Sequence, residues 1–100
     1  MMDTILKSRF KLQGKPRLNQ RLGLGKLDKN EKGLITAVGG EGHSLETVQR
    51  LMEMGFLVGA AVEVVHLSPF GGDPIVVRVR GALIALRRNE ANAIEILLND

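Results

Sequence analysis

Hydrophobic and polar residues alternate along much of the second half of the chain. The clearest case is "IVVRVR", residues 75–80, where Ile75, Val77 and Val79 fall on one side of an extended chain and Arg78 and Arg80 on the other. Successive side chains of a strand point to opposite faces. This period therefore predicts a strand with one buried and one solvated face, as in antiparallel sheets.

Four further segments have the β-branched and apolar residues that are typical of strands. They are residues 33–38, 61–67, 84–86 and 94–98. In the second of them the pair Val64-Val65 interrupts the alternation, which predicts a bulge or burial on both faces. Asn89 is expected to cap one helical turn before the last strand.

One segment, "HSLETVQRLMEMGF" (residues 43–56), follows helical spacing. The hydroxyl of Ser44 can accept from an unpaired amide of the first turn, and Gly55 can adopt the left-handed conformation that ends a helix. Glu46 and Arg50 are spaced for an ion pair on the solvent side. The predicted apolar face consists of Leu45, Val48, Leu51 and Met52.

Five short strands and one helix, placed after the first strand, cannot cover both faces of an open sheet. Closing the sheet would hide its edges and enclose a core. The pattern therefore predicts a mainly β fold, a small SH3-like β-barrel of about five strands.

Charge divides the chain into two parts. Residues 1–32 carry nine Lys or Arg and three Asp or Glu, whereas residues 33–100 carry five and eight. The first part also lacks a hydrophobic period, so we expect a basic, disordered and flexible leader over residues 1–26 and the folded domain over residues 27–100. A solvated extension is the favoured interpretation of this leader, and contact with nucleic acid or an anionic membrane surface is the alternative.

The composition also limits the location of the protein. There is no Cys, and the longest uninterrupted apolar run, residues 55–62, is far shorter than the roughly 18 residues of a membrane-spanning helix. We expect a soluble, cytoplasmic protein that is at most peripheral to a membrane.

Few residues are arranged for chemistry. Gly71 and Gly72 precede a predicted strand, whereas a phosphate-binding loop leads into a helix, so this glycine pair predicts only a corner. His43 and His66 are the only imidazoles and lie on different predicted elements. We therefore predict no catalytic site, no enzyme activity, no metal site and no cofactor, and leave open the binding of a divalent metal ion.

Residues 51–96, "LMEMGFLVGAAVEVVHLSPFGGDPIVVRVRGALIALRRNEANAIEI", resemble the FeoA domain. That family has a helix ending in Leu-x-x-x-Gly, a second glycine before a strand, a Gly-Asp-Pro turn, an alternating strand, a glycine, and a Leu-Arg pair before Ala-x-x-Ile. The matching positions are Leu51, Gly55, Gly59, Pro69, Gly72, Asp73, Pro74, Gly81, Leu86, Arg87, Ala91 and Ile94.

The resemblance implies a small cytosolic protein accessory to FeoB, the membrane ferrous-iron transporter that carries a cytoplasmic GTPase domain. It also implies an SH3-like barrel similar to the third domain of iron-dependent repressors. The expected function is regulation of ferrous iron uptake through protein contact. The alternatives are a nucleic-acid-associated module and a metal-responsive switch in which His43 or His66 binds iron. No nucleic-acid partner is expected, and formation of a homo-oligomer is left open.

Three residues are predicted to bind the partner. Met54 lies about 180° from Leu45 at helical spacing, off the apolar face, although a place in the core is an equal alternative. Alternation places two arginines in a row on the outer face of one strand. The predicted partner-binding residues are thus Met54, Arg78 and Arg80, and the predicted fold-maintaining residues are Leu51, Gly55, Gly59, Pro74 and Gly81.

Overall fold

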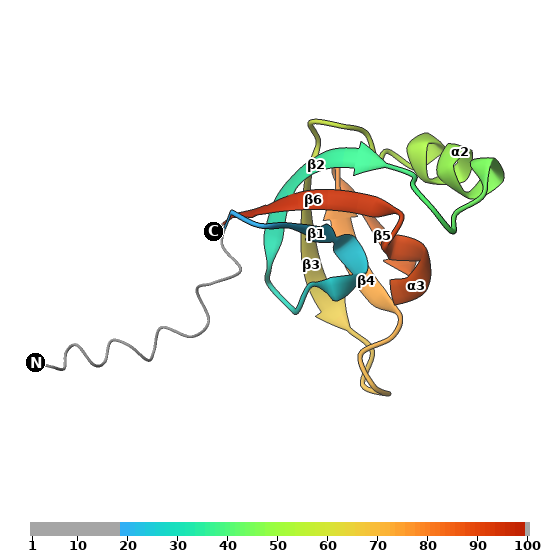
Figure 1. Ribbon diagram of the computed structural model, residues 1–100. Helices are drawn as coiled ribbons and strands as arrows, with labels where there is room; N and C mark the ends of the chain where they lie inside the picture. Colours follow the sequence, from blue (N-terminus) through green and yellow to red (C-terminus); the bar gives the residue numbers. More distant parts are fainter. Residues whose placement is uncertain (1–18, 100) are drawn as a thin grey trace, which may run out of the picture.

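The computed structural model describes residues 19–99, which form one antiparallel sheet with two short helices and a 3-10 turn (Figure 1). The strands are arranged in the order β1-β6-β2-β3-β4-β5. The elements are β1 (Arg21–Gly23), η2 (Leu24–Lys26), β2 (Lys32–Val38), α2 (Leu45–Glu53), β3 (Ala61–Leu67), β4 (Ile75–Val79), β5 (Ala82–Leu86), α3 (Arg88–Ala91) and β6 (Ile94–Asn99).

The sheet curves around its own core, and two irregularities in strand pairing contribute to this curvature. The pairing of β2 with β6 shifts between Ile35 and Ala37, and that of β3 with β4 shifts between Val64 and His66. Such bulges bend a strand and increase its local twist. The irregularity predicted at Val64-Val65 is therefore confirmed as a bulge.

The core follows the predicted alternation. In β4, Ile75, Val77 and Val79 are buried and Arg78 is exposed. The same period in β6 buries Ile94, Ile96 and Leu98 against them. Because one face of each strand supplies the core, the sheet needs no helical layer beneath it, and the prediction of a mainly β fold is confirmed.

The fold begins earlier in the sequence than predicted. β1 pairs with β6, and the following turn η2 inserts Leu24 into the core, where this side chain is fully buried. The boundary predicted after residue 26 is therefore wrong, because residues 21–26 supply a sixth strand and core side chains. The rest of the predicted leader, residues 1–18, lies outside the described residues.

In the part of the chain that the structure describes, β1 and β5 are the two edge strands, and they do not pair with each other. Arg88 of α3 connects this helix with η2 and with the loop between β3 and β4. Its Nη1 donates to the carbonyl oxygens of Gly25 and Leu27 and its Nε to that of Gly72, all at 2.8 Å. We call these four residues the Arg88 cluster; it links η2, α3 and the β3–β4 loop across the open side of the sheet.

The short helix α3 is capped differently from the prediction. Asn89 lies inside the helix, and Arg87 occupies the N-cap position without a capping side chain. The carboxylate of Asp73 replaces the missing cap, since its Oδ1 accepts from the backbone N of Arg88 at 3.0 Å. An acidic group is favourable at a helix N-terminus, and here the β3–β4 loop supplies it.

Candidate partner-binding surfaces

The local signals that delimit α2 are confirmed. Ser44 Oγ accepts from the backbone N of Thr47 at 3.1 Å. After the helix, Gly55 has a φ of +108°, a conformation that L-residues rarely adopt. The ends of the helix are therefore determined by residues adjacent to it in sequence.

The orientation of α2 differs from the prediction. Leu51 is fully buried, but Leu45 and Met52 are 72% and 45% exposed, so only part of the predicted apolar face packs on the sheet. Arg50 forms an ion pair with Glu90 of α3 in place of the predicted pair with Glu46. Met52 follows Arg50 by two positions, about 200° around the helix, so when Arg50 faces α3 Met52 faces solvent.

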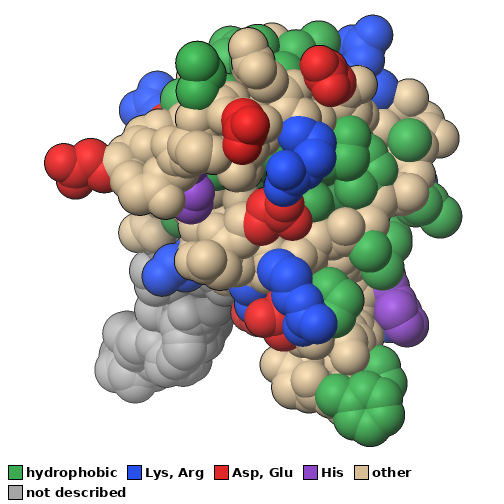
Figure 2. Space-filling view, turned by 90° about the vertical axis from the view of Figure 1, so that its right-hand side faces the viewer, with side chains coloured by type: hydrophobic (Ala, Val, Ile, Leu, Met, Phe, Trp, Pro, Cys, Tyr) green, Lys and Arg blue, Asp and Glu red, His purple; other side chains and the backbone are tan. Residues whose placement is uncertain are grey.

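The exposed apolar side chains continue beyond the helix. Leu57 and Val58, in the turn that follows α2, are also exposed. We call Leu45, Met52, Leu57 and Val58 the α2 surface. Figure 2 shows the face that carries α2 and α3, where hydrophobic side chains reach the surface between separated acidic and basic ones. Exposed apolar side chains grouped on one element are typical of protein contact surfaces.

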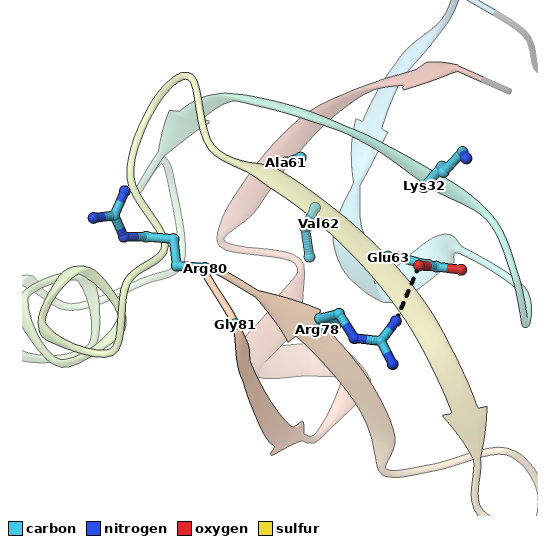
Figure 3. Close-up of a pocket in the computed structure, with 7 residues that line it drawn as sticks. All are labelled: Lys32, Ala61, Val62, Glu63, Arg78, Arg80 and Gly81. Carbon is cyan, nitrogen blue, oxygen red and sulfur yellow. Dashed lines mark hydrogen bonds and ion pairs between the residues drawn. The ribbon is translucent and has the colours of Figure 1, made fainter.

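The two predicted arginines do not form a row. Arg78 points outward from β4, and its Nη1 lies 3.3 Å from Glu63 Oε1 on β3. Arg80 lies beyond the end of β4, in the turn to β5, with a φ of +49° that breaks the strand alternation. Its side chain extends away from that of Arg78, toward the α2 end of the molecule (Figure 3). The prediction that Arg78 and Arg80 stand in a row on the outer face of one strand is therefore wrong.

Met54 and Arg80 do lie in the same region. A methyl group placed on Gly55 would be 3.4 Å from Cδ of Arg80, so the stem of this arginine passes next to Gly55, the residue after Met54. Met54 itself is half-buried and packs against the core. Arg80 thus connects the end of α2 with the outer face of the sheet.

The structure also locates the predicted fold-maintaining residues. Leu51 is in the core, Gly55, Gly59 and Gly81 have positive φ, and Pro74 immediately precedes β4. The pair Gly71-Gly72 forms part of the loop between β3 and β4, as predicted for a corner.

Two further observations concern metal and membrane. Among residues 19–99, no three His, Asp or Glu side chains are grouped so that they could hold a metal ion. Within the same residues, no helix is both long enough and apolar enough to cross a membrane.

Sequence reasoning did not identify Arg88 or Glu90. The side chain of Arg88 binds carbonyl groups that are 16, 61 and 63 residues away in the sequence, and Glu90 pairs with Arg50, 40 residues away. Carbonyl acceptors carry no residue-specific signal. One feature of the sequence could have indicated this role of Arg88. The residue lies in a very short helix between loops, where a long arginine side chain can reach several chain segments.

The FeoA domain model matches residues 22–97 of the sequence. The chain belongs to the FeoA family. The match begins within β1, in agreement with the corrected boundary of the fold. The resemblance inferred from the Gly-Asp-Pro turn and its flanking residues is thereby confirmed.

Solved FeoA structures resemble this chain. One of them is Stenotrophomonas maltophilia FeoA, which was solved in complex with zinc and is described as a prokaryotic SH3 domain protein. It is 30% identical to this chain with a TM-score of 0.65, and the match covers 73% of this chain and 86% of that chain. Chlorobium tepidum FeoA is 32% identical with a TM-score of 0.65, covering 76% and 70%. The SH3-like fold class is thus confirmed. Comparison with curated proteins gives no match.

A manganese-dependent transcriptional repressor also matches, at a TM-score of 0.67 but only 15% identity, over 79% of this chain and 42% of that one. At this identity the similarity concerns the fold alone. FeoA membership supports an accessory role in ferrous iron uptake, in agreement with the proposed activity of the Stenotrophomonas protein as a ferrous iron transport activating factor.

Proposed function

We propose that this FeoA protein is a non-enzymatic accessory factor of ferrous iron uptake that contacts the cytoplasmic part of a FeoB-type transporter. The observation that carries the proposal is the orientation of α2, which buries Leu51 but leaves Leu45 and Met52 exposed. Exposure of a large apolar side chain is unfavourable by about 1.5–3 kcal/mol relative to burial, so a surface of this kind is stabilised when a partner covers it.

The proposed contact consists of the α2 surface and of the polar residues that border it. Arg80 borders it at Gly55, and its guanidinium can form forked hydrogen bonds with a carboxylate of the partner. Met54 supports this contact from beneath, since it packs against the core next to Gly55. Arg78 pairs with Glu63 and contributes from the neighbouring face of the sheet.

The experiment compares two sets of exposed apolar residues. The double variant Leu45→Gln with Met52→Gln removes the centre of the α2 surface, and Phe70→Ser, in the exposed β3–β4 loop, is the matched control. Both variants are assayed for binding to the isolated cytoplasmic domain of FeoB and for ferrous iron uptake in cells whose own FeoA gene has been deleted. We expect the double variant to remain folded, bind at least ten times more weakly and fail to restore uptake, while Phe70→Ser behaves like the wild type.

Normal binding and uptake by a folded double variant would contradict the proposed contact. A nucleic-acid-associated function is not proposed, because the similarity to the repressor concerns the fold alone. A metal-responsive switch at His43 or His66 is likewise not proposed, because residues 19–99 contain no group of three or more His, Asp or Glu side chains that could hold a metal ion.

A further inference from the structure

A groove of about 250 Å³ lies on the outer face of the sheet, across β2, β3 and β4. Ala61 and Gly81 contribute small residues to its lining, together with Val62 (Figure 3). The groove is separate from the α2 surface but adjoins its border, because Arg80 lines the groove and also lies against Gly55. It therefore has an apolar base that can accept an aliphatic side chain.

Charged side chains surround this base. Strand register places Lys32 opposite Glu63 and Glu63 opposite Arg78 in a row across three strands, and Arg80 stands at the end near α2. These are three cations and one carboxylate, a local charge of +2. Residues 19–99 as a whole carry nine Lys or Arg and nine Asp or Glu. The groove is therefore positive on a domain with no net charge from these residue types.

The cations of the groove are available for a ligand. Among residues 19–99, neither Lys32 nor Arg80 takes part in an ion pair within 4.0 Å. Arg78 is paired with Glu63 through a single contact of 3.3 Å, with its side chain 53% exposed. An exposed pair of this kind contributes about 1 kcal/mol or less, so an incoming carboxylate can compete with Glu63 for Arg78.

We propose that this groove binds an acidic segment of a protein partner, with an aliphatic side chain over Ala61 and Gly81 and carboxylates on Lys32 and Arg80. The inference rests on the proposed function only for the identity of the partner. Lys32 and Arg78 are two strands apart, about 10 Å. A single compact anion would require these cations to converge on one point. Cations that are this far apart over an apolar base are better matched to the separate carboxylates of a peptide.

The test uses the full-length protein labelled with ¹⁵N. It is titrated with the blocked peptide acetyl-Glu-Leu-Glu-Glu-Leu-Glu-amide and with the same peptide in which every Glu is replaced by Gln. We expect the acidic peptide to shift the backbone amide signals of Lys32, Glu63, Arg78 and Gly81, and the Gln peptide to shift none of them.

Three variants make the test specific. Lys32→Gln with Arg80→Gln should weaken binding of the acidic peptide at least tenfold, and Lys32→Gln alone should weaken it by a smaller factor. Glu63→Gln should strengthen binding at least twofold, because it removes the carboxylate that competes for Arg78. Arg21→Gln in β1 removes one charge, as Lys32→Gln does, at a residue that does not line the groove, and it should bind like the wild type.

Equal binding of both peptides, shifts confined to α2, or unchanged affinity in the folded double variant would overturn the proposal. Displacement of the peptide by a short oligothymidylate, with the same amides shifted more strongly, would assign the groove to nucleic acid instead. The peptide experiment involves no transporter. If the acidic peptide does not bind, the proposed contact of the α2 surface with the transporter is unaffected. If the Leu45 and Met52 double variant supports normal uptake, the α2 contact is overturned and the proposal for the groove is unaffected.

Discussion

The side chain of Arg88 joins three chain segments that lie far apart in the sequence. One guanidinium satisfies three backbone carbonyl groups, and the backbone N of the same residue is bound by Asp73. Lys could not replace it, because a single ammonium group lacks the planar, forked donors that reach η2 and the β3–β4 loop at once.

Replacing Arg88 by Ala should lower the free energy of unfolding by at least about 2 kcal/mol, because each hydrogen bond to a charged group contributes about 1.5–3 kcal/mol and three acceptors lose their donor. The neighbouring Arg87 is exposed and makes one contact of 3.5 Å, so Arg87→Ala should change stability by less than about 0.5 kcal/mol. Urea denaturation followed by circular dichroism measures both. Equal midpoints for the two variants would show that the Arg88 cluster contributes little.

Two glycines should respond differently to a methyl group. At Gly25 the methyl would overlap the carbonyl group of Arg88, so Gly25→Ala must displace α3 from η2 and should cost about 3 kcal/mol or more. At Gly81 nothing lies within 4 Å, and only the φ of +83° is unfavourable, about 1–2 kcal/mol. Thermal unfolding of the two variants should therefore rank Gly25→Ala well below Gly81→Ala, and the reverse ranking would contradict the close approach of η2 and α3.

At the scale of the element, the ends of α2 are determined by residues next to it in the sequence, whereas its orientation is determined by contacts with distant residues. Ser44 and Gly55 delimit the helix from within its own sequence. Which side faces the sheet depends on Leu51 and on the ion pair between Arg50 and Glu90. Helical periodicity identifies an apolar face but does not say whether the fold or a partner will cover it.

Replacing Ser44 by Ala should reduce stability by about 1 kcal/mol, because the amide of Thr47 loses the acceptor that it has in the folded helix. Gln49→Ala, at an exposed position of the same helix, serves as the control and should be neutral or slightly stabilising. Hydrogen exchange of the amides of α2 gives a second readout, with faster exchange in the first turn of Ser44→Ala only. Unchanged exchange there would contradict the capping role.

The same contrast explains how much of the fold could be predicted from the sequence. Strand alternation in β4 and the irregularity at Val64-Val65 depend on neighbouring residues. The alternation is confirmed, and of the two alternatives for the irregularity, a bulge or burial on both faces, the structure has the bulge. Arg80 was misplaced because a positive φ at a turn is uncommon for a residue other than glycine. β1 was missed because three residues are too short for a period, and its pairing partner, β6, lies at the other end of the chain.

For the whole molecule, β1 and η2 complete the fold at the open side of the sheet. β1 pairs with β6, and η2 adds Leu24 to the core and contacts α3 through the Arg88 cluster. These six residues therefore belong to the cooperative unit, although they lie in the basic part of the sequence.

Two truncations test this point. Deletion of residues 1–26 should lower stability by several kcal/mol relative to deletion of residues 1–18, since loss of one buried Leu side chain alone costs about 2–5 kcal/mol. Chemical denaturation of both proteins measures the difference. Similar midpoints would show that β1 and η2 do not contribute to the fold, as a domain boundary at residue 26 predicts.

The adjacency of β1 and β6 places both ends of the described chain together. The backbone N of Asn19 donates to the carbonyl oxygen of Leu98 at 3.0 Å, whereas α2 lies at the other side of the molecule (Figure 1). A fluorescent protein or affinity tag joined directly to residue 19 or residue 99 would therefore start on the side opposite to α2. In uptake assays in living cells, such fusions would leave the side that carries α2 uncovered.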